Sequence, residues 1–175
     1  MSEYILDEFM HAGMTVQICR DEDPVHPRKD YDHMSVIAHW HSKYDLGKSI
    51  DSGMTEETLR EYFPDIIACL PLYLYDHSGI TINTTGFSCK WDSGQVGWVY
   101  ITSSDAKKMG CSDYSEEKLH EAIRAEVSEY DSYLTGEVYG YRVLSPDGEE
   151  ADACWGFIGS MESARAEACV SAENI

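Results

Sequence analysis

The run His39-Trp40-His41 places two imidazoles two positions apart, inside a stretch at 34–41 that is rich in Val, Ile and Trp. This composition predicts a β-strand, and alternate side chains of a strand lie on one face, so both rings would point the same way. Just upstream lie His33, Asp30 and Asp32, any of which could supply the third ligand that a catalytic zinc site needs. A single His-x-His motif is weak evidence, and the alternative interpretation is that these histidines lie on the polar face of a strand.

A thiolate–imidazole pair is the second chemistry that the residue types allow. Cys69, Cys89 or Cys154 could supply the thiolate, and His77 or His120 the base. No spacing brings a thiol to an imidazole, and free cysteine is commonly a small buried hydrophobe. The enzyme interpretation is therefore a small metal- or thiol-dependent enzyme, with these residues at its centre: His39, His41, His77 and Cys89.

Cofactor motifs are missing from the sequence. Gly94-Gln95-Val96-Gly97 precedes a predicted strand instead of a helix, and no phosphate-binding lysine follows it. No Gly-x-Ser-x-Gly turn and no Asp-x-Asp-x-Asp-Gly calcium loop is present. We therefore predict no cofactor and no metal, with the histidines above as the alternative.

The charge balance is the most unusual feature of the sequence. The chain has 32 Asp and Glu against 13 Lys and Arg, which gives a formal charge of −19. Such a charge opposes binding to nucleic acid or to an anionic membrane and favours a basic partner, although it could serve solubility alone. Carboxylates arrayed on a rigid surface can imitate a line of phosphates. The predicted partner-binding residues are the clustered acids Asp21, Glu22, Asp23, Asp30, Asp32, Glu116, Glu117, Glu121, Glu149, Glu150 and Asp152.

Hydrophobic periodicity predicts an α+β fold, a mostly antiparallel sheet of about six or seven strands with about three helices packed on it. Strands are expected at 14–19, 34–41, 70–75, 80–84, 95–102, 138–144 and 153–158, and helices near 55–63, 115–134 and 161–172. In the longest helix, Asp113 and Glu116 fit a capping box. Its apolar face is predicted to hold Leu119, Ile123, Val127, Tyr130 and Leu134, and its opposite face Glu117, Glu121 and Asp131.

Length and composition predict one domain over residues 1–175, with 1–12 and 21–32 as flexible segments. The first residues are acidic where a signal peptide is basic, and no apolar run is long enough to span a membrane. Six cysteines at scattered spacings, without a Cys-x-x-Cys pair, are typical of reduced thiols. We therefore expect a cytoplasmic protein.

Four segments resemble a family of small, acidic, uncharacterised proteins encoded by bacteriophages and prophages. They are Leu70-Pro71-Leu72-Tyr73-Leu74-Tyr75-Asp76-His77-Ser78-Gly79-Ile80-Thr81-Ile82-Asn83-Thr84-Thr85, Trp91-Asp92-Ser93-Gly94-Gln95-Val96-Gly97, Tyr130-Asp131-Ser132-Tyr133-Leu134-Thr135-Gly136 and Cys154-Trp155-Gly156-Phe157. The likeness covers most of the chain from about residue 34. It implies a setting, the cytoplasm of a host bacterium, and assigns no catalytic residue.

The leading hypothesis is a non-enzymatic, phage-encoded inhibitor that binds a bacterial nucleic-acid-handling defence complex. The expected partner is a basic protein such as a CRISPR effector or a restriction enzyme, bound by acidic mimicry of nucleic acid. The enzyme described above is one alternative. A phage housekeeping or assembly protein is the other.

Overall fold

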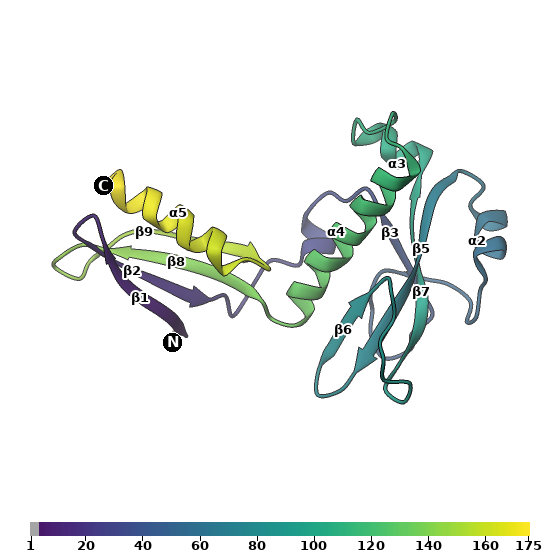
Figure 1. Cartoon of the computed structure of the whole chain (residues 1–175), viewed down its shortest axis with the longest axis horizontal. Helices are drawn as coiled ribbons and strands as arrows, with labels where there is room; N and C mark the ends of the chain where they lie inside the picture. The colour runs from purple at the N-terminus through teal and green to yellow at the C-terminus, as the bar shows by residue number, and fades with distance from the viewer. Residues whose placement is uncertain (1–3) are drawn as a thin grey trace. The chain divides into compact units, whose positions relative to one another are not determined.

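The computed structural model describes residues 4–175 (Figure 1). Its strands form two separate β-sheets. One sheet has four strands in the order β1-β2-β8-β9, and the other has five in the order β4-β3-β7-β5-β6. Every pairing is antiparallel except the short parallel contact of β3 with β4. The predicted α+β class with largely antiparallel pairing is confirmed, and its strands are divided between two sheets.

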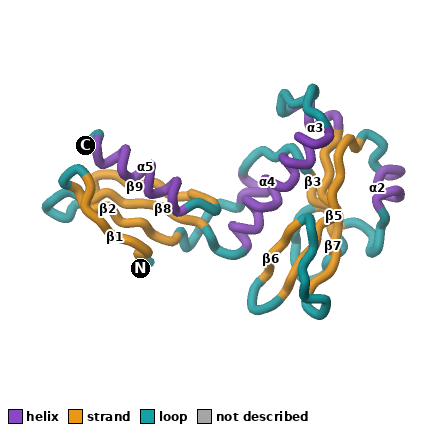
Figure 2. Tube along the Cα trace, in the orientation of Figure 1, coloured by secondary structure: helices purple, strands orange, loops and turns teal. Residues whose placement is uncertain are grey.

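The chain divides into two compact units. The terminal unit consists of Met1–Pro27 and Ser132–Ile175 and holds the four-stranded sheet, while the central unit, Arg28–Asp131, holds the five-stranded sheet. Figure 2 shows helices, strands and loops in both units. The single-domain organisation expected from the sequence stays a prediction.

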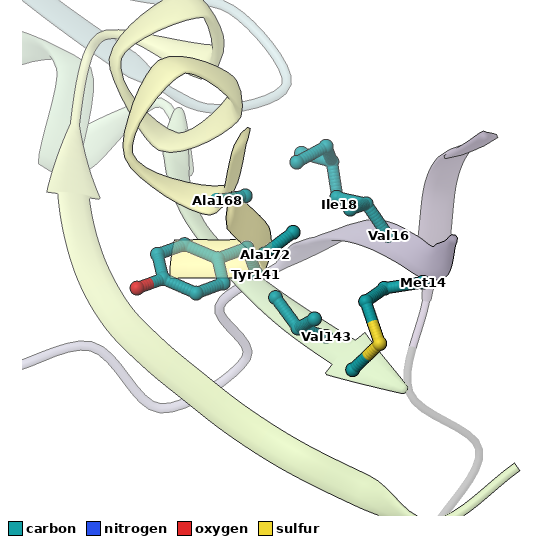
Figure 3. Close-up of a cluster of buried hydrophobic side chains, with 7 residues drawn as sticks. All are labelled: Met14, Val16, Ile18, Tyr141, Val143, Ala168 and Ala172. Atoms are coloured by element: carbon teal, nitrogen blue, oxygen red, sulfur yellow. The ribbon is translucent and has the colours of Figure 1, made fainter. Parts of the chain in front are cut away.

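In the terminal unit a single long helix packs on one face of the sheet. The elements are β1 (Ile5–His11), β2 (Met14–Arg20), β8 (Val138–Leu144), β9 (Glu150–Ile158) and α5 (Met161–Glu173). Alternation along β2 buries Val16 and Ile18 beneath the helix, and alanines spaced four apart, Ala168 and Ala172, let α5 approach the strands closely. Figure 3 shows this core, to which Met14, Tyr141 and Val143 also belong.

The hairpin predicted at 138–158 is present, with its turn at 145–148 and a second strand that begins at Glu150. Gly140 of β8 lies beneath the Trp155 ring of β9, and a Cβ atom at Gly140 would come within 2.2 Å of that ring. A glycine is therefore required at this point for the two strands to pack. Strand β1 was not expected from the sequence and pairs with β2 along its length.

The central unit places helices on both faces of its sheet. Its elements are α1 (Pro27–Asp30), which begins at the last residue of the terminal unit, β3 (Val36–His39), β4 (Lys48–Ser49), α2 (Glu56–Tyr62), β5 (Ile66–Asp76), β6 (Ile80–Asn83), β7 (Ser93–Thr102), α3 (Ser103–Lys108) and α4 (Glu116–Leu134). Helix α2 buries Leu59 against Ala38, Cys69 and Tyr100 of one sheet face. Figure 1 shows α4 along the opposite face.

The predicted position of α4 is confirmed, and four of the five residues predicted on its apolar face, Leu119, Ile123, Val127 and Tyr130, are buried, whereas Leu134 at its end is half-buried. The predicted capping box is wrong: the Oγ atom of Ser115, not Asp113, accepts a hydrogen bond from a first-turn N–H, that of Lys118, at 3.4 Å.

The placement of Asp131 on the exposed face of α4 is also wrong. Its Oδ1 atom accepts hydrogen bonds of 2.7 Å from the Thr81 hydroxyl and the Ile82 N–H of β6. Asp131 follows Val127 by four residues, so it lies only about 40° around the helix from a buried position.

Candidate functional site

One of the predicted acidic clusters lies at an end of the four-stranded sheet where further acids gather. The Asp21 N–H donates to the Val138 carbonyl at 2.9 Å, and the Gly159 N–H donates to the Glu137 carbonyl at 2.7 Å. These two bonds bring the segment after β2, the start of β8 and the start of α5 to one place. We call this group the acidic end, and its residues are Asp21, Glu22, Asp23, Glu137 and Glu162.

Exposure and local bonding keep the acidic end available to solvent. Glu22, Asp23, Glu137 and Glu162 are exposed, and Asp21 is half-buried, with its Oδ1 atom accepting the Asp23 N–H at 3.2 Å. Glu162 also lies in the first turn of α5, where the helix dipole favours a negative charge. Glu137 and Glu162 were missed from the sequence because each is a single acid without acidic neighbours, and only the fold brings them beside residues 21–23.

The predicted cluster at 149–152 lies at the opposite end of the same sheet. Strands β2 and β8 pair from Arg20↔Tyr139 to Thr15↔Leu144, and Leu144 in turn pairs with Glu150. Five residue steps along a strand separate the two ends by about 17 Å. The two acidic clusters of the terminal unit therefore form two sites, not one continuous line.

Two of the three acids at 149–152 have partners inside the unit. Glu150 accepts a hydrogen bond of 2.6 Å from Arg142 Nε. Asp152 accepts hydroxyl hydrogen bonds from Ser171 of α5 and from Tyr141 of β8. These two bonds hold the pKa of Asp152 below its usual range, and the bond from Ser171 has the larger effect. These acids join strands and helix, whereas Glu149 is exposed.

Internal ion pairs use most of the positive charge of the terminal unit. Its sequence has 14 acidic and 3 basic residues, a formal charge of −11. Arg142 pairs with Glu150, and Arg165 of α5 pairs with Asp7 while its guanidinium lies 4.0 Å from the centre of the Phe9 ring. The remaining arginine, Arg20, lies beside Gly136 at the acidic end. The unit thus keeps a large negative charge, and Arg20 offsets part of it at the acidic end.

The predicted acids of the central unit are also separated. Asp30 and Asp32 are exposed beside the segment that contacts Glu126 and Glu129 of α4, whereas Glu116 and Glu117 are exposed in the first turn of that helix. Nine or more helical positions correspond to about 14 Å along the axis. Glu121 is exposed between these two groups.

Glu126 of the central unit, which is not among the acids predicted from the sequence, accepts several hydrogen bonds. Its two oxygens accept the Met34 N–H at 2.8 Å and the Ser35 N–H at 3.0 Å, together with the Ser35 hydroxyl. Arg28 Nη1 lies 3.2 Å from Glu126, and Arg28 Nη2 donates to the Ser35 carbonyl at 2.6 Å. Burial lowers the pKa of Arg28, and Glu126 opposes that shift. This network anchors α4 to the segment before β3.

The three histidines considered as metal ligands occupy separate environments. Strand β3 ends at His39, so the argument from strand alternation does not extend to His41. His39 is buried, and its Nε2 atom accepts the Leu46 N–H at 3.3 Å. The Nδ1 atom of His41 lies 3.2 Å from the Lys43 N–H. His33 donates from Nδ1 to the Tyr31 carbonyl at 3.0 Å. Within residues 4–175 no group of three His, Cys, Asp or Glu side chains is placed to hold a metal ion.

Of the thiol candidates, the structure brings Cys89 and His77 to the same carboxylate. Asp92 Oδ2 lies 3.9 Å from the Cys89 Sγ atom and 3.6 Å from the Nδ1 atom of His77. The carboxylate could orient the imidazole, but it contacts the sulfur itself, in the place where a thiol nucleophile needs a base or a cation. Cys69 is a poorer candidate, because burial raises the pKa of its thiol to about 12. Cys89 and His77 thus both approach Asp92, and the structure places a carboxylate, not the imidazole, against the thiol.

A second polar contact lies at the same end of β5. Asp76 accepts hydrogen bonds of 2.8 Å from Lys43 Nζ and 3.1 Å from the Tyr44 hydroxyl. The bond to Lys43 holds the pKa of Asp76 below its usual range, and the same bond raises the pKa of Lys43. Asp76 and Asp92 therefore have cationic or imidazole partners on this edge of the sheet.

A cavity of about 520 Å³ opens on the sheet face beside these residues, between the strands and the segment that joins β6 to β7. Its lining includes two aromatic rings, Tyr73 and Phe87, two hydroxyls, Thr85 and Ser93, and the ammonium group of Lys90. Mixed aromatic and polar walls of this size are typical of small-molecule sites.

Comparison of the chain with models of protein families, with curated proteins and with solved structures finds no match. The resemblance to phage-encoded acidic proteins therefore stays a prediction, as does every function drawn from it. Across residues 4–175 no helix has the length and the apolar composition needed to cross a membrane.

Proposed function

We propose that this protein is a non-enzymatic binding protein that engages a basic, nucleic-acid-binding partner through its acidic end. The observation that carries the proposal is the gathering of Asp21–Asp23, Glu137 and Glu162 on one end of a unit with a formal charge of −11. Fixed carboxylates on a rigid element can occupy a groove built for phosphates, and their field speeds association with a positive surface.

The architecture of the terminal unit supports this role. Its acids lie at strand ends and at a helix start that are held by main-chain hydrogen bonds, so little main-chain entropy would be lost on binding. Arg142 and Arg165 neutralise acids elsewhere in the unit. The narrower form of the proposal is a bacterial defence complex as the partner, either a CRISPR effector or a restriction enzyme, in the host bacterial cytoplasm.

The test measures how far this protein inhibits the defence system in bacterial cells that carry a CRISPR or a restriction system. The readout is the transformation efficiency of a plasmid that the system targets, with and without this protein. The variant Asp21→Lys/Glu22→Lys/Asp23→Lys should abolish inhibition and weaken binding of the purified effector by at least about tenfold, ~1.4 kcal/mol. Binding by wild type should weaken as salt is raised, because exposed charges are screened.

The matched control makes the same change in net charge on the other unit, Glu116→Lys/Glu117→Lys/Glu121→Lys. Circular dichroism and thermal unfolding of both variants establish that each remains folded. If only the first variant loses inhibition, the acidic end is the binding site. Equal loss in both variants would indicate attraction to net charge alone, and full inhibition by both would contradict the proposal.

A thiol-dependent enzyme is the second candidate, favoured by the approach of Cys89 and His77 to Asp92. An activity lost in both Cys89→Ser and His77→Gln, and kept in Cys154→Ser, would establish it. The placement of Asp92 beside the sulfur makes this the weaker of the two proposals.

A further inference from the structure

The cavity in the central unit lies on the part of a sheet face that α2 does not cover. Helix α2 packs where Cys69 and Tyr100 face it, and Tyr73 follows on the same face of β5, paired with Gln95. Beyond the helix, aromatic and hydroxyl side chains line this face. The cavity over them has a volume of about 520 Å³ and is open to solvent. That volume accommodates one ring system with a substituent.

The walls of the cavity are fixed by contacts that do not involve a ligand. Asn83 Oδ1 accepts the N–H groups of Thr85 and Gly86 at 3.1 and 2.7 Å, which shapes the turn after β6. Gly86 has a φ of 86°, a conformation that favours glycine. Phe87 is held at 5.7 Å from the Tyr75 ring, and the Ser93 hydroxyl donates to the Cys89 carbonyl. A site built in advance loses less entropy on binding.

The polar groups that line the cavity favour an anion. Lys90 has no ion pair, and the Thr85 hydroxyl no hydrogen-bond partner, among residues 4–175. The carboxylates that follow on the adjoining strand ends, Asp76 and Asp92, already contact Lys43 and His77. An ammonium and a free hydroxyl beside two aromatic rings suit a planar ring that carries an anionic group.

We propose that this cavity binds a small ligand made of a planar ring and a single anionic group, a phosphate or a carboxylate. The ring lies against Tyr73 and Phe87, and the anion accepts from Lys90 and Thr85. A polyanion is disfavoured, because the protein has a formal charge of −19 and the cavity has one lysine. The proposal is independent of any partner of the acidic end.

Calorimetric titration of the full chain tests it with matched pairs of probes. Uridine monophosphate is compared with uridine, 4-hydroxybenzoate with 4-hydroxybenzyl alcohol, and inorganic phosphate measures the anion alone. At least one ring anion should bind tenfold or more tightly than both its neutral counterpart and phosphate. The nucleotide and the carboxylate arms show which anion the cavity selects. Tyr73 and Phe87 resonances should shift on saturation.

Lys90→Gln should remove the preference for the anion, and Lys107→Gln, an exposed lysine on α3, should keep it. Phe87→Leu should weaken the binding of the ring anion and of its neutral counterpart by similar factors. Equal affinities for anion and neutral ring, equal behaviour of the two lysine variants, or no binding of any probe at millimolar concentration would each overturn the proposal.

Discussion

The two units of this protein are both acidic, but they use their acids differently. The central unit has 18 acidic and 10 basic residues, a formal charge of −8, and it places carboxylates inside its structure. Glu126 and Asp131 of α4 accept main-chain N–H groups from the segment before β3 and from β6. The terminal unit, at −11, leaves acids exposed at both ends of its sheet.

This difference separates stability from recognition. A half-buried carboxylate that accepts several N–H groups cannot be removed without leaving those groups, and any cation paired with it, without their partner. An exposed acid at the end of a sheet contributes little to folding and much to the surrounding field. Net charge alone therefore indicates neither role, and the two units can be distinguished by removing one acid from each.

The largest effect is expected for Glu126→Gln in the central unit. The change removes the charge that partners Arg28, whose side chain is only 10% exposed, and leaves the guanidinium buried without its counter-ion. We expect the free energy of unfolding to fall by about 3–5 kcal/mol. Urea denaturation followed by circular dichroism measures it, with the two units treated as separate transitions if the curve is not two-state.

Glu121→Gln is the matched control, since it lies on the same helix and is exposed. Its effect should stay within about 0.5 kcal/mol. A Glu126→Gln protein as stable as Glu121→Gln would mean that the Arg28 network does not anchor α4, and the distinction between the units would fail.

Local patterns in the sequence predicted most helices and strands. The apolar spacing of most of α4 was predicted correctly because residues three and four positions apart determine it. Strand β1 was missed because Asp7 and Glu8 interrupt its apolar pattern. In the structure Asp7 pairs with Arg165, which is far away in the sequence. Glu8 accepts a hydrogen bond from Gln17, and no local motif indicates that contact.

The candidate sites were predicted less well, since they depend on contacts between distant segments. Clustered acids such as 21–23 are visible in sequence, whereas Glu137 and Glu162 join them only through the pairing of β2 with β8. The interpretation of His39 and His41 as a pair on one strand failed because β3 ends between them. Cys89 and His77 do share a neighbour, Asp92, which no spacing rule predicted.

A smaller effect is expected when a cation is removed from the terminal unit. In Arg165→Met the ion pair with Asp7 and the contact with the Phe9 ring are lost, while the aliphatic stem is largely kept. The Arg165 side chain is 46% exposed, so solvent screens the pair, and we expect a loss of about 1 kcal/mol.

The same substitution in the central unit, Arg28→Met, leaves the half-buried Glu126 carboxylate without its cation and should cost several times more. Unfolding free energies of the two variants give the comparison directly. Equal losses would show that burial of the ion pair does not set its importance in this protein.

The smallest effect is a dependence of stability on pH in the acid range, traced to Asp152. Its pKa is held below the ordinary value of 3.8, first by the Ser171 hydroxyl. Because the folded pKa is lower than the unfolded one, the ionised carboxylate stabilises the fold above that ordinary value. This stabilisation is lost as pH falls through the folded pKa.

Asp152→Asn should therefore lose less stability than wild type between neutral pH and pH 2, since an amide cannot be protonated there. Asp147→Asn, in the exposed turn between β8 and β9, is the control and should follow wild type. Thermal unfolding at several pH values measures the slopes. If Asp152→Asn keeps the wild-type slope, the bonds that join β8, β9 and α5 through this carboxylate do not depend on its charge.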